Sequence, residues 1–327
     1  MPTLTRRRFV IAAGGLSMTR GASAQERVRR IGAVFGGSST THKRALAALV
    51  AGLEELGWQE GRNLVIDARW AEGHIGRVPA LAAEVVRGAP DVIVTAGNPV
   101  IAEVRKATRT VPIVMATGSD PVAAGFVASL ARPGGNLTGV TGFYESTPVK
   151  MIEVVSELVP GGSRIAAMFE RNTVFTQARY RSDLVKSAEG YHLKVDTHEV
   201  AAPDDLDRVL RAVANDRRAA LLILPGPMIF AFHERLVAGA EKLAMPVVYP
   251  FEEMAEAGGL ISYAPNLLDS YRSAARYVDR ILRGTHPGDL PIEQPKRLQL
   301  AVNLRTARSK GIRLPASILG RADRFIE

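Results

Sequence analysis

The sequence predicts an α/β protein with two Rossmann-like lobes, each a parallel β-sheet covered by helices on both faces, joined by a hinge. Three observations carry this prediction. Short apolar segments rich in Val and Ile alternate with longer segments whose apolar residues recur at helical spacing. A turn cluster at 132–136 interrupts the alternation, which then begins again. A chain of 327 residues, 46% of them hydrophobic, is long enough to fill two cores.

The first half reads as strands and helices in strict alternation. The first two predicted helices end on Gly57 and Gly88, and glycine commonly ends a helix. A predicted helix over 121–131 starts with the pair Asp120-Pro121, which suits a helix start. The predicted strands are 30–35, 63–70, 91–97 and 111–117, and the predicted helices are 42–57, 77–88, 99–108 and 121–131.

A short strand with two glycines, 137–143, leads into the second half, where the same alternation returns. The predicted helices here are 149–161, 175–190, 203–216, 229–244 and 269–284. The predicted strands are 163–170, 193–200, 219–226, 245–250, 259–265 and 297–304. In open α/β sheets, ligands bind beyond the carboxyl ends of the strands, so two facing sheets predict a cleft between them.

The first 24 residues have the organisation of an export signal. Three arginines at 6–8 precede a short apolar run at 9–18, and an Ala-x-Ala site ends at Ala24. The run is shorter than the roughly 20 residues that a membrane-spanning helix needs. Its weak hydrophobicity and Arg20 resemble a twin-arginine signal more than a general secretory one. We expect cleavage after Ala24 and a periplasmic protein; a mature basic N-terminus in the cytosol is the alternative.

Charge and cysteine content exclude several classes of protein. The first 24 residues hold four arginines and no acid, so the remainder has 38 basic and 33 acidic residues, a net charge of +5. The basic residues form no long run, so we expect no nucleic-acid partner. Because the chain has no cysteine, disulfides, thiolate chemistry and cysteine-based zinc sites are excluded.

Four long motifs resemble those of the periplasmic substrate-binding proteins of ABC transporters, in the type I group typified by tryptophan- and tyrosine-binding members. The motifs are "GLEELGWQEGRNLVIDARWAEG" (52–73), "GSDPVAAGFVASLARPGGNLTGVT" (118–141), "EEMAEAGGLISYAPN" (252–266) and "EQPKRLQLAVNLRTARSKGIRLP" (293–315). The resemblance covers essentially the whole chain after the leader, in order.

The resemblance implies a type I periplasmic binding fold that bends at a hinge and delivers its ligand to an ABC permease in the inner membrane. It implies lobe 1 over 27–140 with about 265–300, and lobe 2 over 141–264 with about 301–327. The expected hinge residues are Thr141, Gly142, Ser262 and Tyr263. The implied ligand is an amino acid or a similar small organic compound, and the expected state is a monomer.

Motifs of catalysis are missing from the sequence. There is neither a P-loop nor a nucleophile elbow, and the glycines at 32–37 have the wrong spacing for a dinucleotide site. His233 and Glu234 begin like a zinc-protease motif, but position 237 is Val. We therefore expect no enzymatic activity, no metal and no cofactor.

The candidate ligand contacts lie in the loops that follow the predicted strands. Hydroxyl and amide side chains just before helices favour an anion such as an α-carboxylate, because the helix start offers free N–H groups. Acidic loop residues suit an ammonium group, and aromatic residues suit an apolar part. The predicted contacts are Phe35, Ser38, Ser39, Thr95, Gly97, Asn98, Thr117, Ser119, Asp120, Glu170, Asn172, Pro225, Tyr249 and Phe251.

Structural roles compete with binding at several of these positions. Asp120 before Pro121, and Asn98 before Pro99, are also good helix caps, and capping does not exclude binding. Glu170 fits a solvated loop acid equally well. Two other functions are compatible with the same two-lobed fold: a ligand-binding sensor that acts on a membrane receptor, and a periplasmic enzyme. A repressor of this fold would need a DNA-binding helix-turn-helix before the first lobe.

Overall fold

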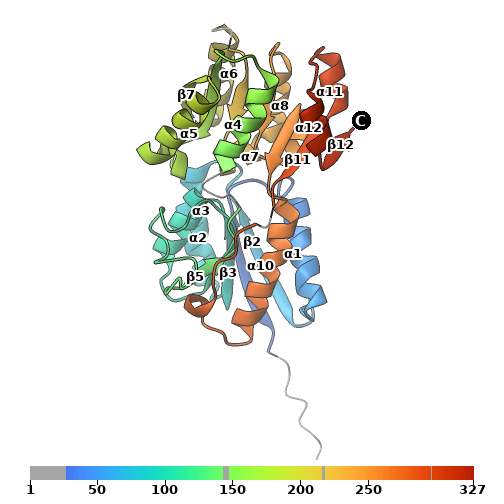
Figure 1. The fold of residues 1–327 in the computed structure, drawn as a ribbon. Helices are drawn as coiled ribbons and strands as arrows, with labels where there is room; N and C mark the ends of the chain where they lie inside the picture. Colours follow the sequence, from blue (N-terminus) through green and yellow to red (C-terminus); the bar gives the residue numbers. More distant parts are fainter. Residues whose placement is uncertain (1–26, 143–146, 216–217, 296) are drawn as a thin grey trace, which may run out of the picture.

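The computed structural model describes residues 27–142, 147–215, 218–295 and 297–327. The predicted leader, 1–24, lies outside these ranges. Two β-sheets lie one above the other, each flanked by helices, and the two halves of the chain occupy different lobes (Figure 1). The predicted two-lobed α/β fold is confirmed. No helix among the described residues combines the length and the apolar character needed to cross a membrane.

The first sheet has five parallel strands in the order β2-β1-β3-β4-β5. Side chains alternate across it, so Ile31 and Phe35 of β1 join the core under α1 and α10, whereas Val34 joins the core under α2 and α3. Its elements are β1 (Arg29–Phe35), α1 (Lys43–Glu55), β2 (Leu64–Trp70), α2 (Val78–Arg87), β3 (Val92–Ala96), α3 (Asn98–Ala107), β4 (Ile113–Thr117), β5 (Leu137–Gly139) and α10 (Leu267–Leu282).

The second sheet has seven strands in the order β12-β11-β10-β9-β8-β6-β7. β11 pairs antiparallel with β10, so β11 and β12 run against the other five strands. Its strands are β6 (Arg164–Glu170), β7 (Lys194–Val200), β8 (Leu221–Ile223), β9 (Val247–Tyr249), β10 (Ile261–Ala264), β11 (Gln299–Asn303) and β12 (Arg324–Ile326).

The helices of this half cover both faces of the second sheet. They are α4 (Thr147–Leu158), α5 (Ala178–Gly190), α6 (Pro203–Asn215), α7 (Pro227–Ala231), α8 (His233–Glu241), α9 (Glu252–Glu256), α11 (Leu304–Ser309) and α12 (Ala316–Arg321). Short 3-10 helices lie at η1 (Ile75–Arg77), η2 (Val174–Thr176) and η3 (Pro287–Asp289).

The chain passes between the two sheets after β5, after β10 and again before β11. After β10, Asn266 caps α10 by accepting a 3.0 Å hydrogen bond from the N–H of Asp269. α10 then packs on α1 and returns the chain to the first sheet (Figure 1). The first sheet therefore takes part of its core from residues that follow most of the second sheet in sequence.

The predicted helix over 121–131 is wrong. Residues 121–125 form turns, and the N–H of Phe126 bonds to the carbonyl of Pro121 at 2.8 Å, which closes the chain on itself. Asp120 does cap this segment, because its Oδ1 accepts from the N–H of Ala123 at 2.9 Å. Gly125 then adopts a φ of +68°, which a continuing helix does not allow. A capping pair such as Asp-Pro starts turns as readily as helices.

The predicted helix over 229–244 is two helices, α7 and α8, which meet at Phe232. The sequence prediction also missed α9 and the short edge strand β12, both of which contain fewer than six residues.

Candidate ligand-binding site

A cavity of about 60 Å³ lies between the carboxyl ends of the strands of the two sheets. A single water needs only roughly 10–15 Å³ on this measure, so the cavity has room for a small organic molecule. The first lobe lines it with His42, Leu267, Tyr271 and residues 96–99 and 117–119. The second lobe lines it with Thr173, Phe230, Phe251 and residues 225–227.

On the first lobe, the side-chain amide of Asn98 ties the start of α3 to the loop after β4. Its Nδ2 donates to the carbonyl of Ser119 at 2.6 Å, and its Oδ1 accepts from the N–H of Ser119 at 2.8 Å. The N–H groups of Val100 and Ile101 donate to the carbonyl of Gly97, both at 3.0 Å. Pro99 has no N–H, so the backbone N–H of Asn98 is the first-turn donor that these bonds leave for a ligand.

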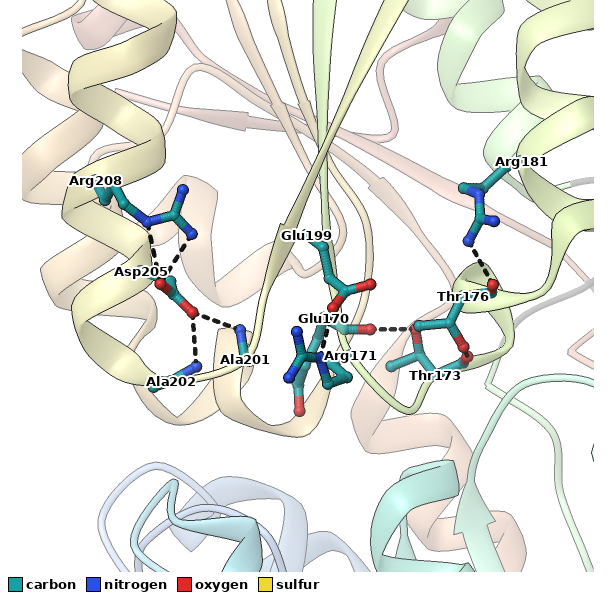
Figure 2. A network of polar contacts seen from close by, with 10 residues as sticks. All are labelled: Glu170, Arg171, Thr173, Thr176, Arg181, Glu199, Ala201, Ala202, Asp205 and Arg208. Carbon is teal, nitrogen blue, oxygen red and sulfur yellow. Dashed lines mark hydrogen bonds and ion pairs between the residues drawn. The ribbon is translucent and has the colours of Figure 1, made fainter.

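On the second lobe, the side chain of Glu170 caps the start of α7. Glu170 is the last residue of β6, and its Oε2 accepts from the N–H groups of Met228 at 2.8 Å and Ile229 at 3.2 Å. Figure 2 shows Glu170 at the end of β6 that faces the first lobe, beside Thr173, whose hydroxyl donates to the Glu170 carbonyl at 2.7 Å. Burial raises the pKa of Glu170 to about 7, and the two N–H bonds partly oppose this shift.

A glycine makes room for this carboxyl group. A Cβ on Gly226 would lie 2.2 Å from Oε2 of Glu170, closer than real contacts allow. The start of α7 is therefore built around a buried acid, and its first-turn N–H groups point at Glu170 rather than into the cavity.

Aromatic rings from both lobes meet at one wall of the cavity. His42 stacks on Phe35 with ring centroids 5.3 Å apart and meets the edge of Phe230, from the other lobe, at 4.9 Å. Phe230 in turn contacts Phe251 at 4.9 Å. Burial lowers the pKa of His42 to about 4, so the ring is neutral at neutral pH. This wall therefore offers apolar and aromatic surface to a ligand.

Several contacts join the lobes directly. Tyr180 on α5 donates its hydroxyl to Oδ2 of Asp120. Arg44 on α1 and Glu256 on α9 form an ion pair with N–O separation 2.5 Å. A Cβ on Gly97 would come within 2.6 Å of Pro227 Cγ, so the two lobes touch closely there. These contacts bring the two lobes together beside the cavity.

Six predicted contact residues line the cavity. They are Gly97, Asn98, Thr117, Ser119, Pro225 and Phe251. Thr117 is the last residue of β4, and the other five follow parallel strands, where ligands are expected in open α/β sheets.

Three predicted residues lie in the packed cores instead. Phe35 is fully buried between His42 and Trp70. Thr95 is fully buried in β3, where its hydroxyl donates to the carbonyl of Val34 at 2.9 Å. Tyr249 is 2% exposed in the core of the second lobe.

The other predicted residues lie around the cavity. Ser38 and the exposed Ser39 belong to the turn before α1, where the N–H of Ser38 bonds to Thr41 Oγ1 at 3.0 Å. Asp120 bonds to Ala123 and Tyr180, as described above. Glu170 lies behind Gly226, and the exposed Asn172, at a φ of +63°, lies beyond it on an outer groove.

The sequence prediction missed His42, Phe230 and Tyr271. His42 and Tyr271 sit at or near the starts of α1 and α10, among residues that otherwise pack on the first sheet. Phe230 falls inside a stretch predicted as one long helix. A periodic pattern identifies buried positions but does not tell a core row from a cavity wall.

The predicted hinge residues lie in two of the connections. Thr141 and Gly142 follow β5, and the N–H of Thr141 donates to the carbonyl of Glu293 at 2.8 Å. Ser262 and Tyr263 are in β10, paired with Ala301 and Leu300. Their role in bending stays a prediction.

The two parallel-sheet lobes and the cavity between their strand ends define the class of two-lobed solute-binding proteins. Residues 38–326 match the family model of ABC transporter substrate binding proteins, and the chain belongs to this family. The sequence is 22% identical over 261 residues to the tyrosine-binding protein of Clostridioides difficile (strain R20291), covering 80% of this chain and 74% of that protein.

Solved structures share the fold. A conserved domain protein from Vibrio cholerae is 25% identical, with a TM-score of 0.84 over 91% of this chain and all of that one. An ABC domain in complex with L-Trp from Streptococcus pneumonia is 23% identical, with a TM-score of 0.83, over 91% of this chain and 99% of that one. A ligand-free, open substrate binding protein from Clostridium difficile is 21% identical, with a TM-score of 0.64 over 91% and 99%.

The described residues contain no group of three or more His, Asp or Glu side chains arranged to hold a metal ion. The family and these neighbours are solute-binding proteins rather than enzymes.

Proposed function

We propose that this chain is an exported solute-binding protein that captures an amino acid or a similar small organic compound between its lobes and delivers it to an ABC permease. The observation that carries the proposal is the cavity at the facing strand ends, lined from both lobes. The membership of the family supports delivery to a permease. The names of two relatives, one tyrosine-binding and one bound to L-Trp, support an aromatic amino acid as the first ligand to try.

Closure of the lobes gives this proposal a physical mechanism. Closing removes the ligand from water, so a few well-placed hydrogen bonds and apolar contacts hold it. The Asp120–Tyr180 hydrogen bond and the Arg44–Glu256 ion pair form only when the lobes meet, because each joins one lobe to the other.

The division of the chain and its location complete the proposal. Lobe 1 would comprise 27–140 and about 265–300, and lobe 2 the remainder, with bending at Thr141, Gly142, Ser262 and Tyr263. The protein acts as a periplasmic monomer after cleavage near Ala24, without a cofactor. Intact mass of the protein from a periplasmic extract tests the cleavage, and light scattering tests the monomer.

Thermal-shift and calorimetric titration with L-tryptophan, L-tyrosine and the other amino acids tests the function. A ligand that binds the folded state raises the melting temperature by mass action. We expect at least one to bind with 1:1 stoichiometry and to be recovered unchanged. Chemical turnover of the ligand, or no binding across amino acids and related small organic acids, contradicts the proposal.

A further inference from the structure

His42 places an imidazole ring in the wall of the cavity where the two lobes meet. The residue lies just before α1, lines the cavity and is 6% exposed. Its ring stacks on Phe35 and makes an edge contact with Phe230 of the second lobe. Burial lowers the pKa of His42 to about 4, so the ring is uncharged at neutral pH. One ring nitrogen is then a hydrogen-bond donor and the other an acceptor.

The hydrogen bonds before α1 place the ring proton on Nδ1. Nδ1 of His42 lies 3.2 Å from Oγ1 of Thr41. The Thr41 hydroxyl has a single proton and donates it to the carbonyl of Ser38 at 3.2 Å, so its oxygen accepts from Nδ1. The partner of one imidazole nitrogen fixes the role of the other. Nε2 of His42 is therefore the acceptor.

Nε2 is also the nitrogen that a ligand can reach. It forms no hydrogen bond with the described residues, yet it is not one of their solvent-inaccessible unpaired atoms, so it keeps accessible surface. Gly37 covers the side of the ring that carries Nδ1, because a Cβ on Gly37 would lie 2.6 Å from Nδ1 and 2.5 Å from Cε1. An accessible acceptor without a protein partner, on a residue that lines a cavity, points to a donor inside that cavity.

The surroundings of His42 favour an uncharged donor. Phe230, Phe251 and Leu267 line the same cavity, and none of the described lining residues is Asp, Glu, Lys or Arg. A charged ligand group beside His42 would lose its hydration without a counter-charge. An N–H or O–H group on an aromatic ring supplies the donor together with an apolar body that packs on this wall.

We propose that Nε2 of His42 is a ligand-binding group that accepts a hydrogen bond from an uncharged donor on the ring of the ligand, of the indole N–H or phenol O–H class. This assignment rests on the proposed function and adds a rule for selectivity. Ligands with a ring donor bind more tightly than analogues of nearly the same shape that lack it.

Two ligand pairs test the rule by calorimetric titration: L-tyrosine against L-phenylalanine, and L-tryptophan against 3-benzothienyl-L-alanine, in which sulfur replaces the ring N–H. In the wild type, we expect the donor ligand of each pair to bind about three- to tenfold more tightly, the size of one net hydrogen bond. His42→Phe keeps an aromatic ring between the lobes and removes the acceptor. It should bring the ratio within each pair close to one.

His74→Phe is the matched control. His74 is exposed, and its ring meets that of Phe232 on the other lobe at 6.2 Å, in an outer groove rather than in the cavity. This variant changes a histidine between the lobes without touching the cavity. We expect it to keep the wild-type ratio within each ligand pair.

Nitrogen-15 NMR of the wild-type protein with labelled histidine gives a second test that needs no variant. In the ligand-free protein at neutral pH, we expect the His42 ring to carry its proton on Nδ1 and to show an unprotonated Nε2. The Nε2 signal should move toward the protonated position when L-tyrosine binds, and much less when L-phenylalanine binds.

Each other outcome overturns the assignment. Selectivity that persists in His42→Phe, or that is lost equally in His74→Phe, shows that His42 does not read the ring. A proton on Nε2 of the ligand-free protein, or an Nε2 signal that ignores L-tyrosine, shows that this nitrogen does not accept from the ligand. Tight binding without selectivity in the wild type contradicts this assignment alone, whereas no binding of any of the four compounds contradicts the proposed ligand class as well.

Discussion

The two sides of the cavity differ in the side chain that supports the helix start facing it: an amide in the first lobe and a carboxyl group in the second. Each side is a helix that starts where a parallel strand ends, and each needs partners for its first N–H groups. The first lobe uses a neutral amide, Asn98, which bonds to the neighbouring loop at Ser119. The second lobe uses a buried carboxyl group, Glu170, which bonds to the helix N–H groups themselves.

This difference assigns unequal tasks to the two lobes. The first-turn N–H groups of α7 already bond to Glu170, so α7 offers a ligand the apolar surface of Pro227 and Phe230. The start of α3 keeps the N–H of Asn98, and Thr117 and Ser119 line the cavity from the same lobe. At these two helix starts, the first lobe therefore offers polar groups to a ligand and the second lobe offers apolar ones.

Removal of the Glu170 carboxyl group has the largest expected effect. Glu170→Ala leaves two buried N–H groups of α7 without a partner, at about 1–3 kcal/mol each, so we expect a loss of about 4 kcal/mol in the free energy of unfolding. Glu170→Gln keeps an oxygen acceptor for Met228 and Ile229 and should lose less than about 1 kcal/mol. Urea unfolding at pH 6 measures both. Equal losses would show that the charge of Glu170, rather than its acceptor oxygen, supports α7.

The pH dependence of stability separates the two lobes. The unfolded chain binds a proton at His42 near pH 6.5 and the folded protein only near 4, so stability falls as pH drops through this range. Glu170 acts in the opposite direction, because the folded protein holds its proton up to about pH 7 and the unfolded chain only to about 4.5. Stability from Glu170 is therefore lost as pH rises from about 4.5 to 7. Each contribution is about 3 kcal/mol at most.

The two contributions nearly cancel in the wild type, so single variants should reveal them. Relative to the wild type, His42→Gln should become less stable as pH rises between 4 and 6.5. Glu170→Gln should become relatively more stable as pH rises between 4.5 and 7. Urea unfolding at half-unit pH steps gives both difference curves. Parallel curves for all three proteins would mean that neither group is titrating in these windows.

Closure is tested at the contact between Gly97 and Pro227. Gly97 has a φ of +82°, and a Cβ there would lie 2.6 Å from Pro227 Cγ on the other lobe. Gly97→Ala should weaken ligand binding by about 30-fold, or about 2 kcal/mol, as expected for an overpacked contact. Gly125→Ala is the control, because Gly125 also has a positive φ, +68°, but nothing within 4 Å of its Cβ position.

Pro227→Ala in the Gly97→Ala background removes Cγ and should restore part of the affinity. A double-mutant cycle with calorimetric titration gives the coupling between the two residues. Additive effects would place the cost of Gly97→Ala in backbone strain rather than in closure.

The ion pair between the lobes has the smallest expected effect. Arg44→Met removes one of the two arginine partners of Glu256, the other being Arg324 on the same lobe, and an exposed pair of this kind contributes about 0–1 kcal/mol. We expect ligand affinity to fall up to about fivefold at low salt and less at high salt. Arg272→Met breaks a 3.2 Å pair with Glu55 that does not cross between the lobes, and should leave affinity unchanged. A similar loss of ligand affinity in Arg44→Met and Arg272→Met would show that the Arg44 ion pair has no specific role in closure.

The sequence predicted the parts of the molecule that follow from the alternation of strand and helix patterns along the chain. Period-2 and helical patterns place strands and helices, and parallel sheets place ligands at strand ends, so Gly97, Asn98, Ser119 and Pro225 could be predicted as cavity residues before the structure was known. Local sequence did not decide what followed Asp120, because the same cap serves a helix and a turn.

Contacts between distant segments could not be predicted in the same way. Tyr249 and Tyr271 are both buried aromatic residues near the ends of elements, yet one fills a core and the other lines the cavity. Their places depend on how α10 crosses back to the first lobe and how far the lobes close. Neither fact is encoded in the hydrophobic periodicity of a single segment.

The return of α10 to the first sheet has a consequence for folding during synthesis. The apolar face of α1, including Ala45, Leu49 and Leu53, packs under α10, which begins at Leu267. At about 5–20 residues per second, a ribosome needs on the order of 10–40 s to proceed from α1 to α10. During that interval the apolar face of α1 lacks the helix that covers it in the finished fold, so the first lobe cannot complete its core until the chain is nearly complete.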